Sequence, residues 1–378
     1  MLRLHLSVND AIKIIRNHSI VLIGGPHRGG TTILWELISL HRSVSAFGSN
    51  IPADFSEGSF LQSVLPTYGV GNEESACFRH RRGVSTAGLG RYALSPYAHQ
   101  TENSPLNRED VRTLLVSEWG RYWDLERPVL LEKTPTNMVS ARLLQALFAP
   151  SASFLFISRH PLAVELAERR MSRCRRTDRF GLGSLNWVAA HSILQADLPS
   201  LASARVIRYE DLVRSPWSCM SKVADWLGLE GAYGHAAQTS GRLPDADFRR
   251  SVLRAAVSNR TNAKYEAEYC GSRLATAARR ARHCALGAAL QPHVTALGLG
   301  YDLLQGGDLG FACIRQRIAA KLVPSAPSNP AVVDCGGQRV EAEQAIADML
   351  QLRTGYRGQP QTHGVDVLGG NRLLCARM

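Results

Sequence analysis

The sequence predicts an α/β fold in which a central parallel sheet is covered by helices on both faces. Short apolar runs at 20–23 and 154–157 alternate with segments whose apolar residues recur at helical spacing. Runs of this length without polar alternation are typical of parallel strands that are buried on both faces. With 378 residues, 45% of them hydrophobic and 20% charged, the chain is long and apolar enough to bury such a core.

The elements follow one another in the order that such a fold requires. Strands are expected at 20–23, 129–131, 154–157 and 205–208, and helices at 9–17, 31–40, 108–123, 137–148, 161–172, 184–198 and 216–227. Asn137 is a candidate cap for its helix, because short polar side chains accept hydrogen bonds from free N–H groups there. Strands that alternate with helices in this way predict a parallel sheet in a three-layer arrangement.

Three regions differ in character along the chain. We expect an N-terminal extension over 1–18, a main α/β domain over 19–303, and an irregular, partly disordered C-terminal tail over 304–378. Within the main domain, 48–107 is rich in Gly, Ser, Pro and Tyr and is expected to form loops that cover a site. In the tail, glycines and prolines interrupt the chain, and only 340–352 has a helical pattern.

The charge balance predicts an anionic partner. The net charge is +12, and only five of the 44 basic residues are lysines. Charge alone does not distinguish nucleic acid, lipid and phosphate ester. No apolar run reaches the roughly 18–20 residues of a membrane span, and no secretory signal is recognisable, so a cytoplasmic protein is expected. Eight cysteines without a Cys-x-x-Cys pair argue against a zinc ribbon or a disulfide scaffold.

A glycine-rich turn joins the first predicted strand to the next helix. Residues 24–32 read Gly-Gly-Pro-His-Arg-Gly-Gly-Thr-Thr, with the two-glycine spacing of a phosphate-binding P-loop at Gly25 and Gly30. Thr31 and Thr32 stand where a nucleotide triphosphatase has Lys-Ser/Thr, and Arg28 supplies a cation inside the loop instead. A helix N-terminus attracts anions, so the segment predicts a P-loop-type domain with a mono- or bisphosphate ligand.

This loop resembles the 5′-phosphosulfate loop of sulfotransferases that use 3′-phosphoadenosine 5′-phosphosulfate (PAPS). The family pattern is a Lys or Arg followed by Ser-Gly-Thr-Thr, and Gly29 replaces the Ser here. The resemblance is nearer to tyrosylprotein, carbohydrate and bacterial or plant sulfotransferase-like members than to cytosolic small-molecule enzymes. It implies that PAPS is bound by Arg28, Gly29, Gly30, Thr31 and Thr32.

Further segments resemble the same family in the same order. Glu-Lys-Thr-Pro at 132–135 is similar to a family turn whose lysine, here Lys133, neutralises the leaving phosphate. The strand that ends in Ser-Arg-His-Pro at 158–161 is similar to the 3′-phosphate motif and implies that Arg159 binds that phosphate, although Ala167 replaces a usual Ser. The Tyr-Glu-Asp-Leu segment at 209–212 implies that Tyr209 lies near the nucleotide. Lys264 matches a late segment that closes over it.

The general base is expected in the irregular 48–107 region. The segment Glu-Gly-Ser-Phe-Leu-Gln at 57–62 resembles a segment of bacterial and plant sulfotransferase-like proteins, which favours Glu57. His99 is the second choice, because histidine is the base in several family branches and titrates in the right range. Arg28 and Lys133 are expected to hold the charge that develops in the reaction, so no metal is required.

The function that follows is sulfuryl transfer from PAPS to an acceptor hydroxyl by in-line displacement, with a Glu or His base. Carbohydrate, protein tyrosine and small-molecule acceptors all remain open. The alternative is a P-loop kinase or another nucleotide-binding protein of related fold. No recognised motif or aromatic platform indicates a nucleic-acid partner. A homodimer is left open.

Overall fold

The computed structural model describes residues 6–39, 41–47, 57–65, 91–95, 98–171, 181–214, 216–229, 287–301 and 303. All of them belong to one compact unit, Met1–Ala326, whereas a second unit, Pro327–Met378, lies outside the described residues. The predicted tail at 304–378, its helix at 340–352 and most of the loop region 48–107 also lie outside them.

Five parallel strands form the centre of this unit, in the order β2-β3-β1-β4-β5. The strands are β1 (Ser19–Gly24), β2 (Val44–Ala46), β3 (Val129–Lys133), β4 (Ala152–Ser158) and β5 (Ala204–Arg208). The predicted parallel sheet is therefore confirmed. The short strand β2 was missed, since three residues give too little periodicity to recognise.

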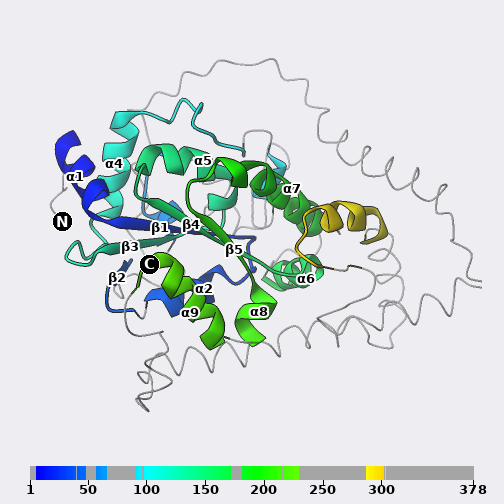
Figure 1. Cartoon of the computed structure of the whole chain (residues 1–378). Coiled ribbons are helices and arrows are strands. Elements are labelled where there is room, and N and C mark those ends of the chain that lie inside the picture. Colours follow the sequence, from blue (N-terminus) through cyan, green and yellow to red (C-terminus); the bar gives the residue numbers. More distant parts are fainter. Residues whose placement is uncertain are drawn as a thin grey trace, which may run out of the picture. The chain divides into compact units, whose positions relative to one another are not determined.

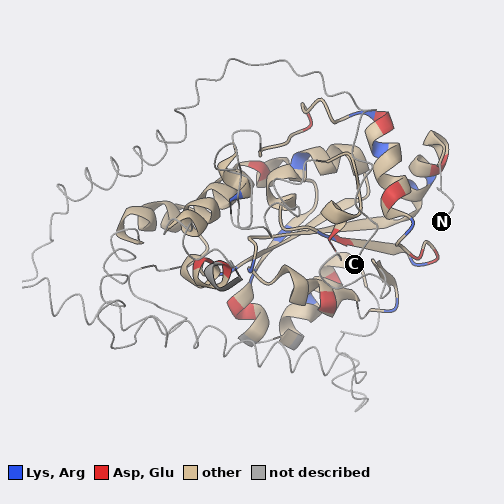
Figure 2. Ribbon diagram, turned by 180° about the vertical axis from the view of Figure 1, so that it is seen from behind, with Lys and Arg blue, Asp and Glu red and all other residues tan. Residues whose placement is uncertain are grey.

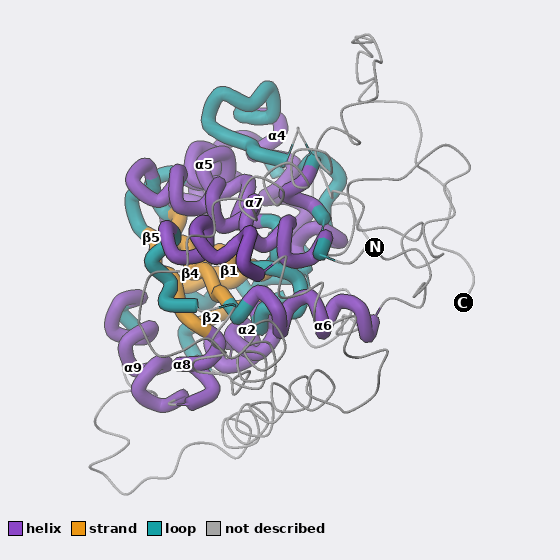
Figure 3. The backbone as a smooth tube through the Cα atoms, turned by 90° about the vertical axis from the view of Figure 1, so that its right-hand side faces the viewer, coloured by secondary structure: helices purple, strands orange, loops and turns teal. Residues whose placement is uncertain are grey.

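Helices cover both faces of the sheet, as Figures 1 and 3 show. Successive side chains of a strand point to opposite faces. Ile20 and Leu22 of β1 therefore join a core cluster on the side of helices α1, α4, α5 and α7. Val21 and Ile23 join a second cluster on the side of α2, α8 and α9. This double burial explains why the strand reads as a continuous apolar run.

Apart from the short helix α8, which the sequence did not predict, the helices named next agree closely with the sequence prediction. They are α1 (Val8–Asn17), α2 (Thr31–Ser39), α4 (Glu109–Trp119), α5 (Asn137–Phe148), α6 (Pro161–Met171), α7 (Leu182–Asp197), α8 (Tyr209–Arg214) and α9 (Pro216–Leu227). Short 3₁₀ turns are η2 (Gly58–Phe60), η3 (Tyr92–Leu94) and η4 (Leu198–Ser200). The prediction that Asn137 caps α5 is wrong, because Thr136 holds the N-cap position and the Asn137 amide binds elsewhere.

Helix α1 lies within the segment predicted as an N-terminal extension. Ser7 and Asp10 form a capping box at its start. Ala11 and Ile15 are buried in the first core cluster, so the helix is part of the layer that covers the sheet. Charged residues lie mostly on the helices and loops, while the strands are largely uncharged (Figure 2). Within the described ranges, every helix is too short or too polar to cross a bilayer.

Candidate functional site

The carboxyl ends of three neighbouring strands bring the predicted phosphate-binding residues to one edge of the sheet. In the register of β1, Ile23 lies beside Lys133 of β3, and Gly24 lies beside Phe156 of β4. The glycine-rich turn that follows β1 is therefore flanked by Lys133 on one side and by Arg159, the residue after β4, on the other. Ligands of open α/β sheets bind at this edge.

The glycine-rich turn has the backbone of an anion cradle. Arg28 has a φ of 61° and Gly30 a φ of 105°, so both lie in the left-handed region, and α2 begins at the next residue. The first turn of a helix leaves N–H groups without intrahelical acceptors, and these can bind a phosphate. Glycine is required at position 30, since a Cβ there would lie 2.5 Å from Cδ2 of Tyr209. The side chains of Arg28 and Thr32 are exposed.

Arg159 supports the turn from β4. Its Nη1 donates a hydrogen bond to the carbonyl oxygen of Arg28 at 2.9 Å, and its guanidinium lies 4.3 Å from the ring centroid of Tyr209. The indole N–H of Trp187 donates to the carbonyl of Arg159 at 2.8 Å. Arg159 is thus buried at the base of the turn, and the ring of Tyr209 lies beside both its guanidinium and Gly30.

Glu210 joins the same edge to the segment near residue 300. Its carboxylate accepts hydrogen bonds from the backbone N–H of His160 and from the hydroxyl of Tyr301, both at 3.0 Å. The guanidinium of Arg208 lies 4.8 Å from the ring centroid of Tyr301. The sequence analysis did not predict this role of Glu210.

Glu57 and Lys133 form an ion pair beside the turn. Nζ of Lys133 donates to Oε1 of Glu57 at 2.8 Å, although the two residues are 76 positions apart. The Lys133 side chain is 2% exposed and the Glu57 side chain 17%. Solvent or a substrate can therefore contact the carboxylate of the pair, whereas the ammonium group is buried. The structure therefore brings together the predicted base and the predicted leaving-group cation.

A buried carboxylate lies directly behind this pair. Glu132 is fully buried and accepts hydrogen bonds from the N–H of Gly58 at 3.0 Å and from the side-chain amide of Asn137 at 2.6 Å. The hydroxyl of Thr134 donates to it as well. Burial raises the pKa of Glu132 from 4.5 to about 7, against the opposing effect of these donors and of Lys133.

His27 lines the turn as a neutral ring. Burial lowers its pKa from 6.5 to about 4, with Lys133 and Arg28 acting in the same direction and Glu57 opposing them. Its ring meets Tyr92 edge-on at a centroid distance of 5.3 Å, and the Tyr92 hydroxyl donates to the carbonyl of Gly25 at 3.3 Å. The imidazole therefore contributes packing against Tyr92, and no positive charge, to the turn.

Comparison with known proteins shows which family the chain belongs to. The model of the sulfotransferase family matches residues 20–233, which is more than half of the chain and contains the turn, Lys133, Arg159 and Tyr209. This chain belongs to the sulfotransferase family. It is accordingly an enzyme that transfers sulfuryl groups.

Solved structures resemble this sulfotransferase at low sequence identity. A sulfotransferase from Mycobacterium tuberculosis is 12% identical, with a TM-score of 0.39 over 65% of this chain and 74% of that one. The sulfotransferase domain of the Synechococcus olefin synthase is 19% identical, with a TM-score of 0.34 over 62% and 82%. Retinol dehydratase, solved with androsterone and the inactive cofactor PAP, is 14% identical, with a TM-score of 0.32 over 91% and 85%. A search of curated proteins finds no match.

His99, the second predicted base, is hydrogen-bonded to a carboxylate outside the glycine-rich turn. Nε2 of His99 lies 3.0 Å from both carboxylate oxygens of Asp197, the last residue of α7. The residue after His99, Gln100, donates its backbone N–H to the carbonyl of Val139 in the first turn of α5 at 2.8 Å. Arg142 lies 3.6 Å from the same carboxylate. Lys264, the remaining predicted ligand, lies outside the described residues.

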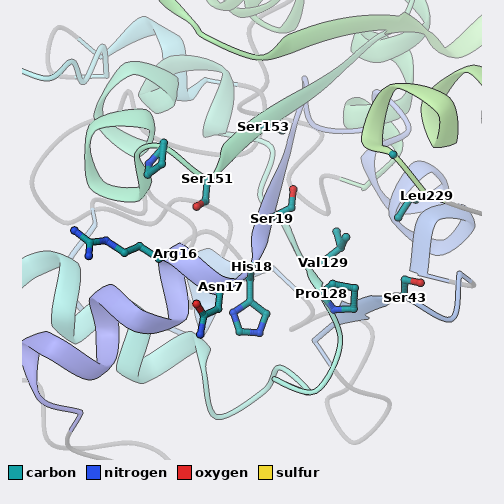
Figure 4. Close-up of a pocket in the computed structure, with 12 residues that line it drawn as sticks. Arg16, Asn17, His18, Ser19, Ser43, Pro128, Val129, Ser151, Ser153 and Leu229 are labelled. Carbon is teal, nitrogen blue, oxygen red and sulfur yellow. The ribbon is translucent and has the colours of Figure 1, made fainter.

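A cavity of about 670 Å³ lies at the edge where the strands begin (Figure 4). It is lined by Ser19 and Val129 at the starts of β1 and β3, together with His18 and residues near the end of α9. Because the glycine-rich turn follows the carboxyl end of β1, this cavity is distinct from the candidate site.

Proposed function

We propose that this sulfotransferase takes the sulfuryl group from PAPS and transfers it to an acceptor hydroxyl, with Glu57 as general base. The observation that carries the proposal is the ion pair of Glu57 and Lys133, 2.8 Å long, beside the phosphate-binding turn. A carboxylate that is 17% exposed and anchored on one side can accept a proton from a substrate hydroxyl on the other.

The turn and its neighbours fit a doubly charged nucleotide. Two left-handed residues at its end, together with the first turn of α2, form a concave set of donors that suits the 5′-phosphosulfate. Arg159, which already bonds to the carbonyl of Arg28, extends the cationic edge toward a second phosphate. Planar guanidinium groups favour phosphate geometry, so Arg28 and Arg159 are proposed to bind the 5′ and 3′ groups, respectively.

Each residue then has a defined part in the reaction. PAPS supplies, when bound, a sulfuryl group joined to its phosphate through a bridging oxygen. Glu57 takes the proton of the acceptor hydroxyl as that oxygen bonds to sulfur. The bond between sulfur and the bridging oxygen breaks, and its electron pair stays on the phosphate. Lys133 and Arg28 balance the charge that grows there. The acceptor is a hydroxyl compound of the carbohydrate, protein-tyrosine or small-molecule class.

Calorimetric titration with 3′,5′-adenosine bisphosphate and with ATP–Mg²⁺ tests the donor assignment. We expect the bisphosphate to bind more tightly, because the turn lacks the Walker lysine that holds a triphosphate. Replacing Arg28 and Arg159 by Ala should weaken bisphosphate binding roughly tenfold or more for each lost charged hydrogen bond. Preferential binding of ATP–Mg²⁺, or equal bisphosphate binding by this double variant, would favour a kinase-like function instead.

A further inference from the structure

Glu132 presents an energetic problem that its neighbours explain. It is fully buried at the end of β3, where an ionised carboxylate is costly unless it is well paired. Its immediate neighbour Lys133 donates to Glu57 rather than to Glu132. The carboxylate instead receives donors from three different places in the chain: Gly58, Thr134 and Asn137.

These contacts converge on the short turn that follows Glu57. Glu132 accepts the N–H of Gly58 at 3.0 Å, and the hydroxyl of Thr134 accepts the N–H of Ser59 at 3.0 Å. The indole N–H of Trp119 donates to the carbonyl of Gly58, also at 3.0 Å. Buried side chains therefore bind three consecutive polar groups of the backbone after Glu57: the N–H and the carbonyl of Gly58 and the N–H of Ser59.

The turn η2 has little capacity to hold itself in place. It consists of three residues, and its N-cap residue, Glu57, makes no side-chain capping bond because its carboxylate is directed to Lys133. The position of the Glu57 carboxylate thus depends on the hydrogen bonds that join Gly58 and Ser59 to the end of β3.

We propose that Glu132 is a positioning residue that holds Glu57 in reach of Lys133 and of the acceptor through the backbone N–H of Gly58. This inference rests on the proposed role of Glu57 as the base. A displacement of about 1 Å in a reacting group can cost roughly 100-fold in rate. Loosening this contact should therefore slow the chemical step and leave nucleotide binding unchanged, since Glu132 does not belong to the phosphate-binding turn.

Replacement by glutamine provides a sharp perturbation. Its amide oxygen can still accept the N–H of Gly58, but its NH₂ group then faces the NH₂ group of Asn137. Asn137 is not free to flip, because the same NH₂ group donates to the carbonyl of Ile23 at 2.9 Å. Glu132→Gln therefore weakens the network, and Glu132→Ala removes it.

The test compares these two variants with wild type and with Glu118→Ala in steady-state kinetics and in hydrogen–deuterium exchange. Glu118 is a matched control, since its carboxylate binds Ser63 at 2.7 Å on the same loop but farther from Glu57. We expect kcat to fall roughly tenfold in Glu132→Gln and roughly 100-fold in Glu132→Ala, with the KM for PAPS and the bisphosphate affinity within about twofold of wild type. Amide exchange at 58–60 should accelerate in both variants, and Glu118→Ala should leave kcat unchanged.

Separate outcomes bear on the two proposals. Unchanged exchange at 58–60 in the Glu132 variants, or a loss that appears in KM and bisphosphate affinity instead of kcat, overturns the positioning role. Full turnover by Glu57→Gln overturns the base assignment, whatever the exchange data show. Combining Glu57→Gln with Glu132→Gln should cause no loss beyond that of Glu57→Gln alone, and an additive loss contradicts an action through Glu57. If the alanine variant fails to fold, the glutamine variant carries the comparison.

Discussion

The buried carboxyl of Glu132 should make stability depend on pH in a way that its amide analogue does not. Burial raises the pKa of this group from 4.5 to about 7. Between these two values the folded chain holds a proton on Glu132 that the unfolded chain has released. The free energy of unfolding contributed by this group therefore falls as the pH rises from 4.5 through 7. Glu132→Gln removes the titrating group and keeps the shape of the side chain.

The size of the effect follows from the two pKa values. The difference between 4.5 and about 7 corresponds to about 3 kcal/mol of stability. Relative to wild type, Glu132→Gln should thus gain about 3 kcal/mol in unfolding free energy between pH 4.5 and pH 8. A variant that is slower yet relatively more stable at high pH would show that this carboxylate is kept for its position at the site and not for the stability of the fold.

Urea unfolding of both proteins at pH 4.5, 6 and 8, followed by tryptophan fluorescence, measures this difference. Taking the difference between the two proteins cancels the titration of all other groups. A difference in unfolding free energy that stays constant within about 1 kcal/mol across this range would refute the reasoning, because it would mean that Glu132 titrates alike in the folded and unfolded chain.

Three further predictions concern the glycine-rich turn after β1 and the core beside it. Arg28→Gly should weaken bisphosphate binding in calorimetry while keeping or raising the melting temperature, since it removes a charge but relieves a left-handed φ of 61° that costs about 1 kcal/mol. Gly30→Ala should lower the melting temperature more than Gly228→Ala, because both positions have a positive φ but only a Cβ at 30 meets Tyr209, whereas nothing lies within 4 Å at 228; equal losses would contradict this. Burial lowers the pKa of His191 from 6.5 to about 3, so stability should fall as the pH drops below 6.5, and urea unfolding of His191→Gln should show a flatter acid limb than wild type.

The fold was predictable because its signals are local. The three central strands β1, β3 and β4 are buried on both faces, so a run such as that of β1 is apolar throughout and stands out from its surroundings. The turn after β1 and the residues after β3 and β4 could also be placed, since the carboxyl ends of parallel strands meet at one edge. The strand β2 and the helix α8 escaped prediction because three and six residues carry no clear period.

The supporting contacts of the site were not predictable in the same way. Asn137 looked like a helix cap, but its amide bonds to Ile23 and Glu132, two residues that only the folded sheet brings near it. His99 had a suitable side chain for a base. Its position beside Asp197 depends on tertiary contacts of its loop with α7 and α5, which the sequence does not reveal. The hydrogen bond of Glu132 to Gly58 spans 74 positions, and no local pattern in the sequence marks it.

Transfer of labelled sulfate from PAPS to a panel of carbohydrate, tyrosine-peptide and small-molecule hydroxyl acceptors, by wild type and by Glu57→Gln, tests the central claim most directly. The account predicts transfer by wild type to at least one acceptor class, and a loss of roughly 10²- to 10⁴-fold in Glu57→Gln with bisphosphate affinity retained. Equal turnover by Glu57→Gln would contradict the assignment of Glu57 as the base.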